Sequence, residues 1–369
     1  MINIVIAGDF SPLDRVESLL RSGTYPVSAL GEVNISDELF ILNFETSIAS
    51  NRSKGITKLG PNLKCTEKVI PFLKEAGVSA VTLANNHTMD YGEDGLMNTI
   101  NLLNQCGIKY VGAGNNKKEA QEPLYLSQGE ETLAIINCCE HEFSYAEDSK
   151  AGTNPLEPIS QYYSIKEAKN KADHVIVIVH GGHEFYNLPS LRMQETYRFF
   201  IDAGADAVIN HHQHCYSGFE YWHGKPIYYG LGNLCFDWAG RLPSFYTGYC
   251  VRLHLGETVS SEEIPYTQCL DEPVVKAGDF DGFRESLEKL NRIIKDPDKL
   301  KCELENYYDS MEKSCEGVLT PFTNEYVKEL VKRGYLPKLI SEKKKMHWKA
   351  YIDCESHRDV MLHYLKKGF

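Results

Sequence analysis

Apolar runs in the first 210 residues end repeatedly in side chains that can bind a metal ion or carry a proton. Carboxylate oxygens and imidazole nitrogens together suit Mn²⁺, Fe or Zn²⁺, and thiolates are absent from the set. A carboxylate that bridges two such ions, with histidines on either side, can hold them about 3.5–4 Å apart, which is the spacing used to activate water for hydrolysis. The residues at these run ends are Asp9, Glu45, Asn85-Asn86-His87 with Asp90, His180 with Glu184, and His211-His212-Gln213-His214.

Regular elements must hold those run ends, and the pattern between them predicts which elements these are. Short apolar runs bounded by Gly, Asn or Asp alternate with amphipathic segments, which favours a layered α/β fold with mixed sheets flanked by helices. Ligands bind at the carboxyl ends of strands in such folds, where these polar residues lie. We predict strands over residues 3–7, 39–44, 80–84, 108–111, 133–137, 175–179, 207–209, 227–229 and 249–253. We predict helices over residues 66–76, 92–105, 160–171 and 191–203.

Composition bounds the class of protein. The chain has 369 residues, of which 42% are hydrophobic and 24% charged, with a net charge of −12. These values exclude a disordered chain, and the acidic excess disfavours nucleic acid and anionic lipid as partners. The longest strongly apolar run, residues 175–179, is far shorter than the roughly 20 residues that cross a bilayer, so we expect no membrane insertion.

The first residues and the cysteines bear on location. No basic stretch precedes Gly8-Asp9, so we expect a buried first strand in place of a signal peptide, and a cytoplasmic protein. The 11 cysteines include no Cys-x-x-Cys pair, which favours reduced thiols over disulfides or a zinc ribbon.

The composition of the chain changes near residue 256. Beyond it, segments rich in Ser, Glu and Asp lead into patterns of helical period, such as residues 283–290. The acidic excess belongs to the first 280 residues, whereas residues 281–369 are close to neutral. We therefore predict an α/β domain over residues 1–255 and a mainly α-helical C-terminal region over residues 256–369.

The run-end motifs, taken with their neighbours, occur in a fixed order along the chain. They are Gly8-Asp9, Asn43-Phe44-Glu45, Asn85-Asn86-His87, Asp90-Tyr91-Gly92, His180 with Glu184, Asp206 through His214, and Tyr229-Gly230-Leu231-Gly232-Asn233. In this order they resemble the CapA/PgsA-type capsule-synthesis family, which is linked to poly-gamma-glutamate export and related in fold to the calcineurin-like metallophosphoesterases. The resemblance covers roughly residues 1–255. It implies a layered metallophosphoesterase-like sandwich.

The resemblance also implies a role for each position. Glu45 matches the carboxylate that bridges two divalent ions, and His87 matches the histidine that protonates the leaving group or stabilises the transition state. Asp90 either orients His87 or caps the helix predicted to follow it. The implied metal ligands are Asp9, Glu45, Asn86, His180, His212 and His214. The residues implied to contact substrate or to orient the ligands are Ser11, Asn43, His183, Glu184, His211 and Asn233.

Some positions depart from the phosphoesterase pattern. Ser11 stands where a histidine usually follows the first aspartate, so the first metal site lacks one strong ligand. Glu45 replaces the usual aspartate, and Asn210 and Gln213 replace the usual glycine and proline of the histidine motif. Asn85-Asn86-His87 is also compatible with a simple turn. The residues expected to be structural are His174, His223 and Cys138-Cys139-Glu140-His141.

The charge of such a centre predicts its chemistry. Two divalent ions beside two carboxylates leave roughly +2 in the cleft, which attracts a small anion within an acidic protein. We predict a metal-dependent hydrolase of a small phosphate ester, with a metal-activated water as nucleophile and His87 as general acid. Hydrolysis or transfer of a gamma-glutamyl amide is an alternative for the same centre. A non-catalytic accessory protein that binds a polyanion or a synthase is a further alternative, and a homo-oligomer or a biosynthetic partner stays open.

Overall fold

Two large β-sheets dominate the computed structural model, which describes residues 1–23, 38–50, 52–58, 60–280, 282–311, 324–336 and 341–353. The chain divides into two compact units, Met1–Leu300 and Lys301–Phe369. Both sheets belong to the first unit. Within the described ranges, no helix has the combination of length and apolar character that a bilayer span requires.

The first sheet has eight strands, and β1 lies within it. The path of seven strands runs β18 (Val275–Ala277), β17 (Val259–Gln268), β16 (Thr247–Leu255), β1 (Ile2–Ser11), β2 (Leu39–Phe44), β5 (Ala80–Thr82) and β6 (Lys109–Val111), and β15 (Asn233–Phe236) also pairs with β1. Strands β1, β2, β5 and β15 are linked by parallel pairing. Their carboxyl ends therefore point the same way, as the polar residues that follow them require.

The second sheet has six strands and packs on the first across an apolar core. Its order is β13 (Phe219–Trp222), β14 (Lys225–Tyr228), β12 (Ala207–His211), β11 (His174–His180), β9 (Glu131–Cys139) and β8 (Leu124–Gln128). Ile4 and Ile6 of β1 belong to one buried cluster with Ile135 of β9 and Ile178 of β11. Strands β9, β11 and β12 pair in parallel, and β11 and β12 are buried along their whole length, as their continuous Val- and Ile-rich runs predict.

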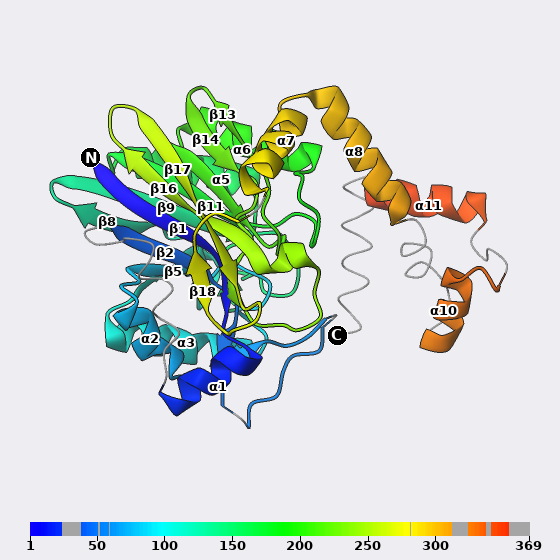
Figure 1. The fold of residues 1–369 in the computed structure, drawn as a ribbon, viewed down its shortest axis with the longest axis horizontal. Helices are drawn as coiled ribbons and strands as arrows, with labels where there is room; N and C mark the ends of the chain where they lie inside the picture. The colour runs from blue at the N-terminus through cyan, green and yellow to red at the C-terminus, as the bar shows by residue number, and fades with distance from the viewer. Residues whose placement is uncertain are drawn as a thin grey trace. The chain divides into compact units, whose positions relative to one another are not determined.

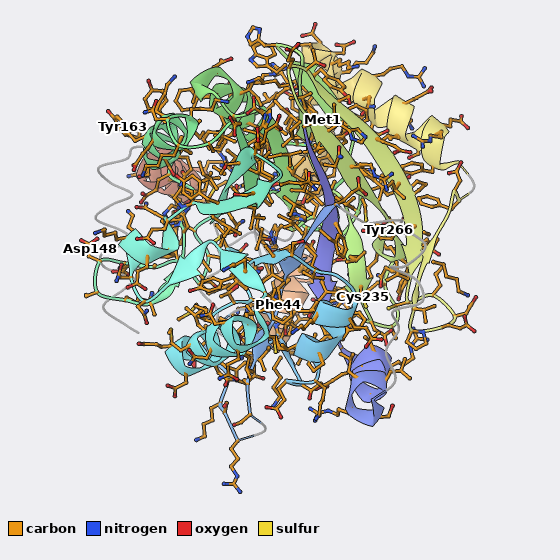
Figure 2. The ribbon with its side chains drawn as sticks, turned by 90° about the vertical axis from the view of Figure 1, so that its left-hand side faces the viewer. Met1, Phe44, Asp148, Tyr163, Cys235 and Tyr266 are labelled. Atoms are coloured by element: carbon orange, nitrogen blue, oxygen red, sulfur yellow. The ribbon has the colours of Figure 1, made fainter. Side chains whose placement is uncertain are left out.

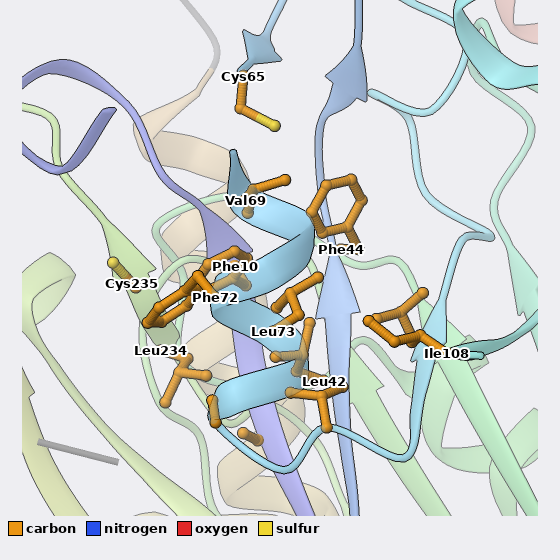
Figure 3. Close-up of a cluster of buried hydrophobic side chains, with 14 of the residues drawn as sticks. Phe10, Leu42, Phe44, Cys65, Val69, Phe72, Leu73, Ile108, Leu234 and Cys235 are labelled. Carbon is orange, nitrogen blue, oxygen red and sulfur yellow. The ribbon is translucent and has the colours of Figure 1, made fainter. Parts of the chain in front are cut away.

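Helices cover the outer faces of both sheets. The helices α1 (Asp14–Ser22), α2 (Val69–Glu75) and α3 (Gly92–Cys106) lie on the first sheet, and α5 (Pro158–Lys169) and α6 (Leu191–Ala203) lie on the second (Figure 1). Phe72 of α2 stacks on Phe10 of β1 with ring centroids 5.8 Å apart, beside Phe44 of β2 (Figure 3). Figure 2 places Phe44 in the interior and Tyr163 of α5 at the surface, where 67% of Tyr163 is exposed.

Smaller elements complete the described chain. In the first unit they are β3 (Ser47–Ile48), β4 (Lys64–Cys65), β7 (Ala113–Gly114), α4 (Lys117–Ala120), β10 (Gly152–Thr153), the 3₁₀ turn η2 (Pro243–Tyr246) and α7 (Phe283–Ile294). Helix α8 (Pro297–Ser310) crosses the boundary between the units. The described residues beyond it form α10 (Glu325–Lys332) and α11 (Glu342–Asp353).

Every predicted strand and helix corresponds to an element of the structure, and the layered α/β sandwich with mixed sheets flanked by helices is confirmed. The sequence predicts a domain boundary after residue 255, whereas in the structure the first unit continues past that residue. Strands β16 and β17 form one antiparallel pair on either side of it, and the first unit extends to Leu300. The polar residues after 256 belong to β17, whose first half alternates between half-buried and exposed positions. An amphipathic strand of this sheet thus produces the change of composition.

Gly8 allows a close approach between β1 and the segment before β15. A Cβ atom on Gly8 would lie 1.9 Å from the carbonyl oxygen of Gly232, which accepts a hydrogen bond from the backbone N–H of Asp9. Since the backbone would have to move, we expect Gly8→Ala to lower the free energy of unfolding by at least about 2 kcal/mol, measured by urea denaturation. Gly256→Ala is the control, because a Cβ there meets no atom closer than 3.7 Å. Equal losses in the two variants would contradict this account.

Candidate metal centre

The ends of β1 and β2 direct two carboxylates away from the helix-side core. Phe10 and Phe44 belong to that core, beside Phe72 of α2 (Figure 3). Asp9 precedes Phe10 at a register shift in β1, Glu45 directly follows β2, and both carboxylates lie near histidines of the second sheet. Both carboxylates are buried, with 1% of Asp9 and 0% of Glu45 exposed. The packing of two phenylalanines therefore positions two acidic groups.

Glu45 lies at the middle of the centre. Its Oε1 atom is 3.7 Å from Nε2 of His180, 3.7 Å from Nε2 of His214 and 4.0 Å from Nε2 of His87. Neither carboxylate oxygen of Glu45 has a hydrogen-bond partner among the described residues. A buried acceptor without a donor is costly unless a cation or a water completes it.

Two groups of donor atoms share Glu45. One consists of Glu45, His180 and His212, the other of Asp9, Glu45 and His214, and in each the donor atoms lie within 4.8 Å of one another. Two ligands of one tetrahedral ion, each at about 2.1 Å, would be about 3.4 Å apart. The 3.7 Å separations from Glu45 Oε1 to the Nε2 atoms of His180 and His214 are close to that value. Both groups can therefore hold an ion with small adjustments.

The protonation of these residues favours a bound cation. Burial, with the nearby Asp9 as the next cause, raises the pKa of Glu45 well above its usual value, and burial raises the pKa of Asp9 to about 7. Burial lowers the pKa of His180 well below its usual value and that of His214 to about 3. Neutral imidazoles keep a lone pair for a metal, and a divalent ion would offset the repulsion between the two carboxylates. The residues present thus fit such an ion.

Asparagine side chains orient the ligands. Asn43 donates from Nδ2 to Oδ1 of Asp9 at 2.8 Å, and the same nitrogen lies 3.2 Å from Nδ1 of His180. Oδ1 of Asn233 lies 2.9 Å from Nδ1 of His214. The contact with Asn233 occupies the Nδ1 side of His214 and leaves its Nε2 to the centre, as outer partners of metal ligands usually do. The structure thus brings Asn43 and Asn233 to the predicted site.

The histidines after β12 depart from regular strand geometry. His212 has a φ of 96° and His214 a φ of 53°, values that are uncommon for residues other than glycine and that cluster at functional sites. The backbone N–H of His212 donates to Oδ2 of Asp9 at 3.2 Å. Nδ1 of the His212 ring lies 3.0 Å from Nε2 of His180. His211 also lies at the centre, with Nδ1 3.4 Å from Oδ1 of Asp9.

His87 lies beside the donors and is held by a buried carboxylate. Its Nδ1 is 2.6 Å from Oδ2 of Asp90, which also accepts the backbone N–H of Leu63. Lys58, only 2% exposed at its side chain, pairs with the other oxygen of Asp90 and lies 3.2 Å from Nδ1 of His87. The N-cap of α3 is Tyr91, without a side-chain capping bond. Asp90 therefore contacts His87, and the helix-capping alternative is wrong.

Neither donor group includes the predicted residues Ser11, His183 and Glu184. Ser11 is buried at the end of β1, and its hydroxyl has no hydrogen-bond partner in the part of the chain that the structure describes. His183 is half-buried with its ring 6.4 Å from that of Tyr186. Glu184 is exposed, and its charge follows burial and Asp9 among the causes that raise the pKa of Glu45.

Two residues at the centre were not predicted as functional. Glu142 accepts a hydrogen bond from Nδ2 of Asn86 at 3.2 Å, and its Oε1 lies 3.5 Å from Nε2 of His212. Oδ1 of Asn86 in turn lies 3.1 Å from Nε2 of His180. Glu142 follows the strand predicted over residues 133–137, so its place after an apolar run was an available signal. Lys58 lies in an irregular segment, where no sequence pattern indicated a functional role.

Comparisons with known proteins agree with the predicted resemblance. Capsule biosynthesis protein CapA from Bacillus anthracis is 32% identical over 220 residues, which are 57% of this chain and 54% of that protein. PGA biosynthesis protein CapA from Bacillus subtilis strain 168 is 30% identical over 198 residues, 53% of this chain and 52% of that protein. The chain thus spans about half the length of these curated relatives.

Solved structures and a family profile complete the comparison. A phosphatase from Mycoplasma pneumoniae aligns with a TM-score of 0.45 at 16% identity, over 77% of this chain and 98% of that one. The family described as Bacterial capsule synthesis protein PGA_cap matches residues 3–238, well over half of the chain. This protein therefore belongs to the bacterial capsule synthesis protein PGA_cap family.

Proposed function

We propose that this protein is a metal-dependent hydrolase that cleaves a small phosphate ester with water. The observation that carries the proposal is Glu45, a fully buried carboxylate shared by two donor groups and without a hydrogen-bond partner among the described residues. A shared carboxylate flanked by imidazoles is what a pair of hydrolytic metal ions requires. The ligands would be Asp9, Glu45, His180, His212 and His214, with Asn86 beside them.

The protein side chains divide the work of the reaction. When bound, the two ions supply Lewis acidity, which makes water a nucleophile near neutral pH and draws charge from the phosphoryl group. The water oxygen loses a proton and forms a bond to phosphorus, and the bond from phosphorus to the leaving oxygen breaks. His87 gives its Nε2 proton to that oxygen, and the proton released by the water restores His87. Asp90 stabilises the protonated ring from the Nδ1 side, and Lys58 balances the charge of Asp90.

Gamma-glutamyl amide hydrolysis or transfer is the second candidate. The Bacillus subtilis relative is named a PGA biosynthesis protein, and an amide carbonyl can be polarised by the same ligand set. A polyanion-binding accessory role is the third candidate, and a synthase would be its partner. For all three, we propose work on small or flexible anions rather than nucleic acid, in a reducing compartment such as the cytoplasm. Nine described cysteines without a disulfide suit such a compartment.

One experiment separates these candidates. Protein purified without chelator is analysed for bound Mn, Fe and Zn, then assayed with phenyl phosphate, bis(4-nitrophenyl) phosphate and gamma-glutamyl 4-nitroanilide. We expect up to two ions for each chain and metal-dependent hydrolysis of an ester. Cleavage of the anilide alone would favour the second candidate. A protein that binds no metal and cleaves none of the three would exclude both enzymes.

Metal removal should also change stability. A ligand that binds only the folded state at 100 times its dissociation constant stabilises by about 2.7 kcal/mol. We therefore expect the unfolding temperature to fall when EDTA removes bound metal and to recover when Mn²⁺ is added in excess. Differential scanning calorimetry measures both, with NaCl at matched ionic strength as the control. An unfolding temperature that responds to neither addition would contradict the assignment of the donor groups.

A further inference from the structure

Arg241 is a cation near the metal centre that no carboxylate of the described residues neutralises. In the described part of the chain, no acidic side chain forms an ion pair with Arg241, and its Nε is buried without a hydrogen-bond partner. Two other cations near the centre are paired, Lys58 with Asp90 and Arg192 with Glu140. In a chain with a net charge of −12, an unpaired guanidinium at such a place needs an explanation.

Aromatic rings hold the guanidinium of Arg241. Its Cζ lies 3.7 Å from the ring centroid of Trp238, 5.5 Å from that of Phe185 and 6.0 Å from that of Phe245. The hydroxyl of Tyr246 accepts the backbone N–H of Arg241 and donates to the carbonyl of Trp238, which fixes the loop. Stacking on aromatic faces keeps the positive charge and leaves the edge of the guanidinium available to an anion.

The same rings connect Arg241 to the centre. The ring centroids of Phe185 and Phe245 lie 5.8 Å and 5.9 Å from that of His214. The charge of Arg241 is also among the causes, after burial, that lower the pKa of His214. One layer of aromatic side chains therefore separates the guanidinium from a predicted metal ligand. A substrate group held at Arg241 would lie beside the reacting group, not on it.

Phe185 adds an independent observation. It is 43% exposed and has a φ of 60°, a conformation that is strained for a bulky side chain. Its N–H donates to the carbonyl of Gln213 at 2.8 Å, in the same segment as His214. Burial offsets this strain only in part, since 43% of the residue stays exposed. The backbone instead displays an aromatic face between solvent, Arg241 and His214.

We propose that Arg241, Phe185 and Trp238 form an anion-recognition subsite beside the metal centre, so that the substrate carries a second anionic group besides the one that reacts. The proposal rests on the proposed function, because the metal centre would bind the reacting group. A carboxylate or a second phosphate would accept paired hydrogen bonds from the planar guanidinium, and Phe185 would cover the chain between the two groups.

Matched substrates test the subsite and distinguish its two ligand chemistries. O-phosphoserine carries a carboxylate that O-phosphoethanolamine lacks, and fructose 1,6-bisphosphate carries a phosphate that fructose 6-phosphate lacks. In one of the two pairs, we expect the wild-type kcat/KM to favour the member with the second anionic group by about 10-fold to 100-fold. The preference should act mainly through KM, as hydrogen bonds to a charged group imply. The pair that shows the preference identifies the anion. Arg241→Gln should abolish the preference, and Arg241→Lys should restore only part of it.

Arg284→Gln is the matched control variant. Arg284 also lies over an aromatic ring, at 5.3 Å from that of Phe283, but it pairs with Glu263 and is exposed. It should keep the wild-type preference. Equal kcat/KM within both substrate pairs, or a preference that survives in Arg241→Gln, would overturn the subsite and leave the hydrolase proposal standing.

A binding measurement keeps the test independent of turnover. Phosphonoacetate and methylphosphonate differ by one carboxylate and cannot be hydrolysed as esters, and 1,2-ethylenediphosphonate supplies a second phosphonate in its place. Calorimetry with Mn²⁺-loaded protein should show that one of the two probes with a second anionic group binds about 10-fold or more tightly than methylphosphonate. Arg241→Gln should remove the difference. If this discrimination is found but no ester is cleaved, the hydrolase proposal fails and the subsite stands. If neither phosphonoacetate nor 1,2-ethylenediphosphonate binds more tightly than methylphosphonate, the subsite is wrong.

Discussion

Replacing Glu45 with glutamine should remove metal from both donor groups at once. Glu45 is the member that the two groups share, and its Oε1 is the atom nearest to the surrounding imidazoles. We expect Glu45→Gln to lose all tightly bound metal, measured by elemental analysis. Hydrolysis should fall by more than about 100-fold, the upper end of the loss caused by changing an outer partner of a metal ligand.

The stability of Glu45→Gln should change in the opposite direction from its activity. In metal-free protein, the buried carboxylate of Glu45 has no hydrogen-bond partner among the described residues, so a neutral amide of the same size costs less to bury. Metal-free Glu45→Gln should therefore be at least as stable as metal-free wild type in urea denaturation.

A buried carboxylate outside the centre provides the matched control. Asp206 is 7% exposed but pairs with Lys225 at 2.9 Å and Lys169 at 3.2 Å. Asp206→Asn should keep its metal and lose stability, because it leaves two cations without their partner. If Glu45→Gln kept its full metal content, Glu45 would not be the ligand that the two donor groups share.

Replacing His87 with asparagine should slow the reaction without removing the metal. His87 belongs to neither donor group, and its Nε2 lies 4.0 Å from the central oxygen of Glu45 while Asp90 holds its Nδ1. Loss of a general acid typically costs about 10²-fold to 10⁴-fold in rate. We expect a fall of this size in kcat for phenyl phosphate, with KM and metal content close to those of wild type.

The leaving group gives this prediction its sharpest readout. 4-Nitrophenolate leaves readily without a proton, whereas phenolate needs one, so His87→Asn should be much less impaired on 4-nitrophenyl phosphate than on phenyl phosphate. Asp90→Asn should show the same dependence on leaving group to a smaller degree, because it acts through the ring of His87. Equal impairment on both esters would exclude His87 as the proton donor.

The layers of the fold could be predicted from the sequence because each layer has its own pattern of apolar residues along a short stretch of chain. The buried parallel strands appear as short Val- and Ile-rich runs, and helices α3 and α6 have an amphipathic period. Strand β17 was not predicted because its polar face hides it in a Ser- and Glu-rich stretch. Its membership of the first sheet depends on pairing with β16, which no local pattern records.

The candidate site was predictable to the same extent. Asp9, Glu45 and His180 follow apolar runs, so their meeting at the ends of parallel strands could be expected. The exact contacts could not, because the positive φ of His212 breaks the alternation that would otherwise place its neighbour His211 on the opposite side. Both rings consequently lie near other site residues. Lys58 was missed because an isolated lysine in an irregular segment is usually solvated.

The centre joins donors that are far apart in the chain, and this has a consequence for synthesis. Asp9 of β1 and His212, which directly follows β12 of the second sheet, are separated by 203 positions. At about 5–20 residues per second, a ribosome takes roughly 10–40 s to add the second after the first. Until His212 and His214 are added, the nascent chain lacks two of the histidines of the donor groups. If the donor groups bind metal as proposed, metal ions can assist only the last stage of folding, after both sheets have emerged and docked.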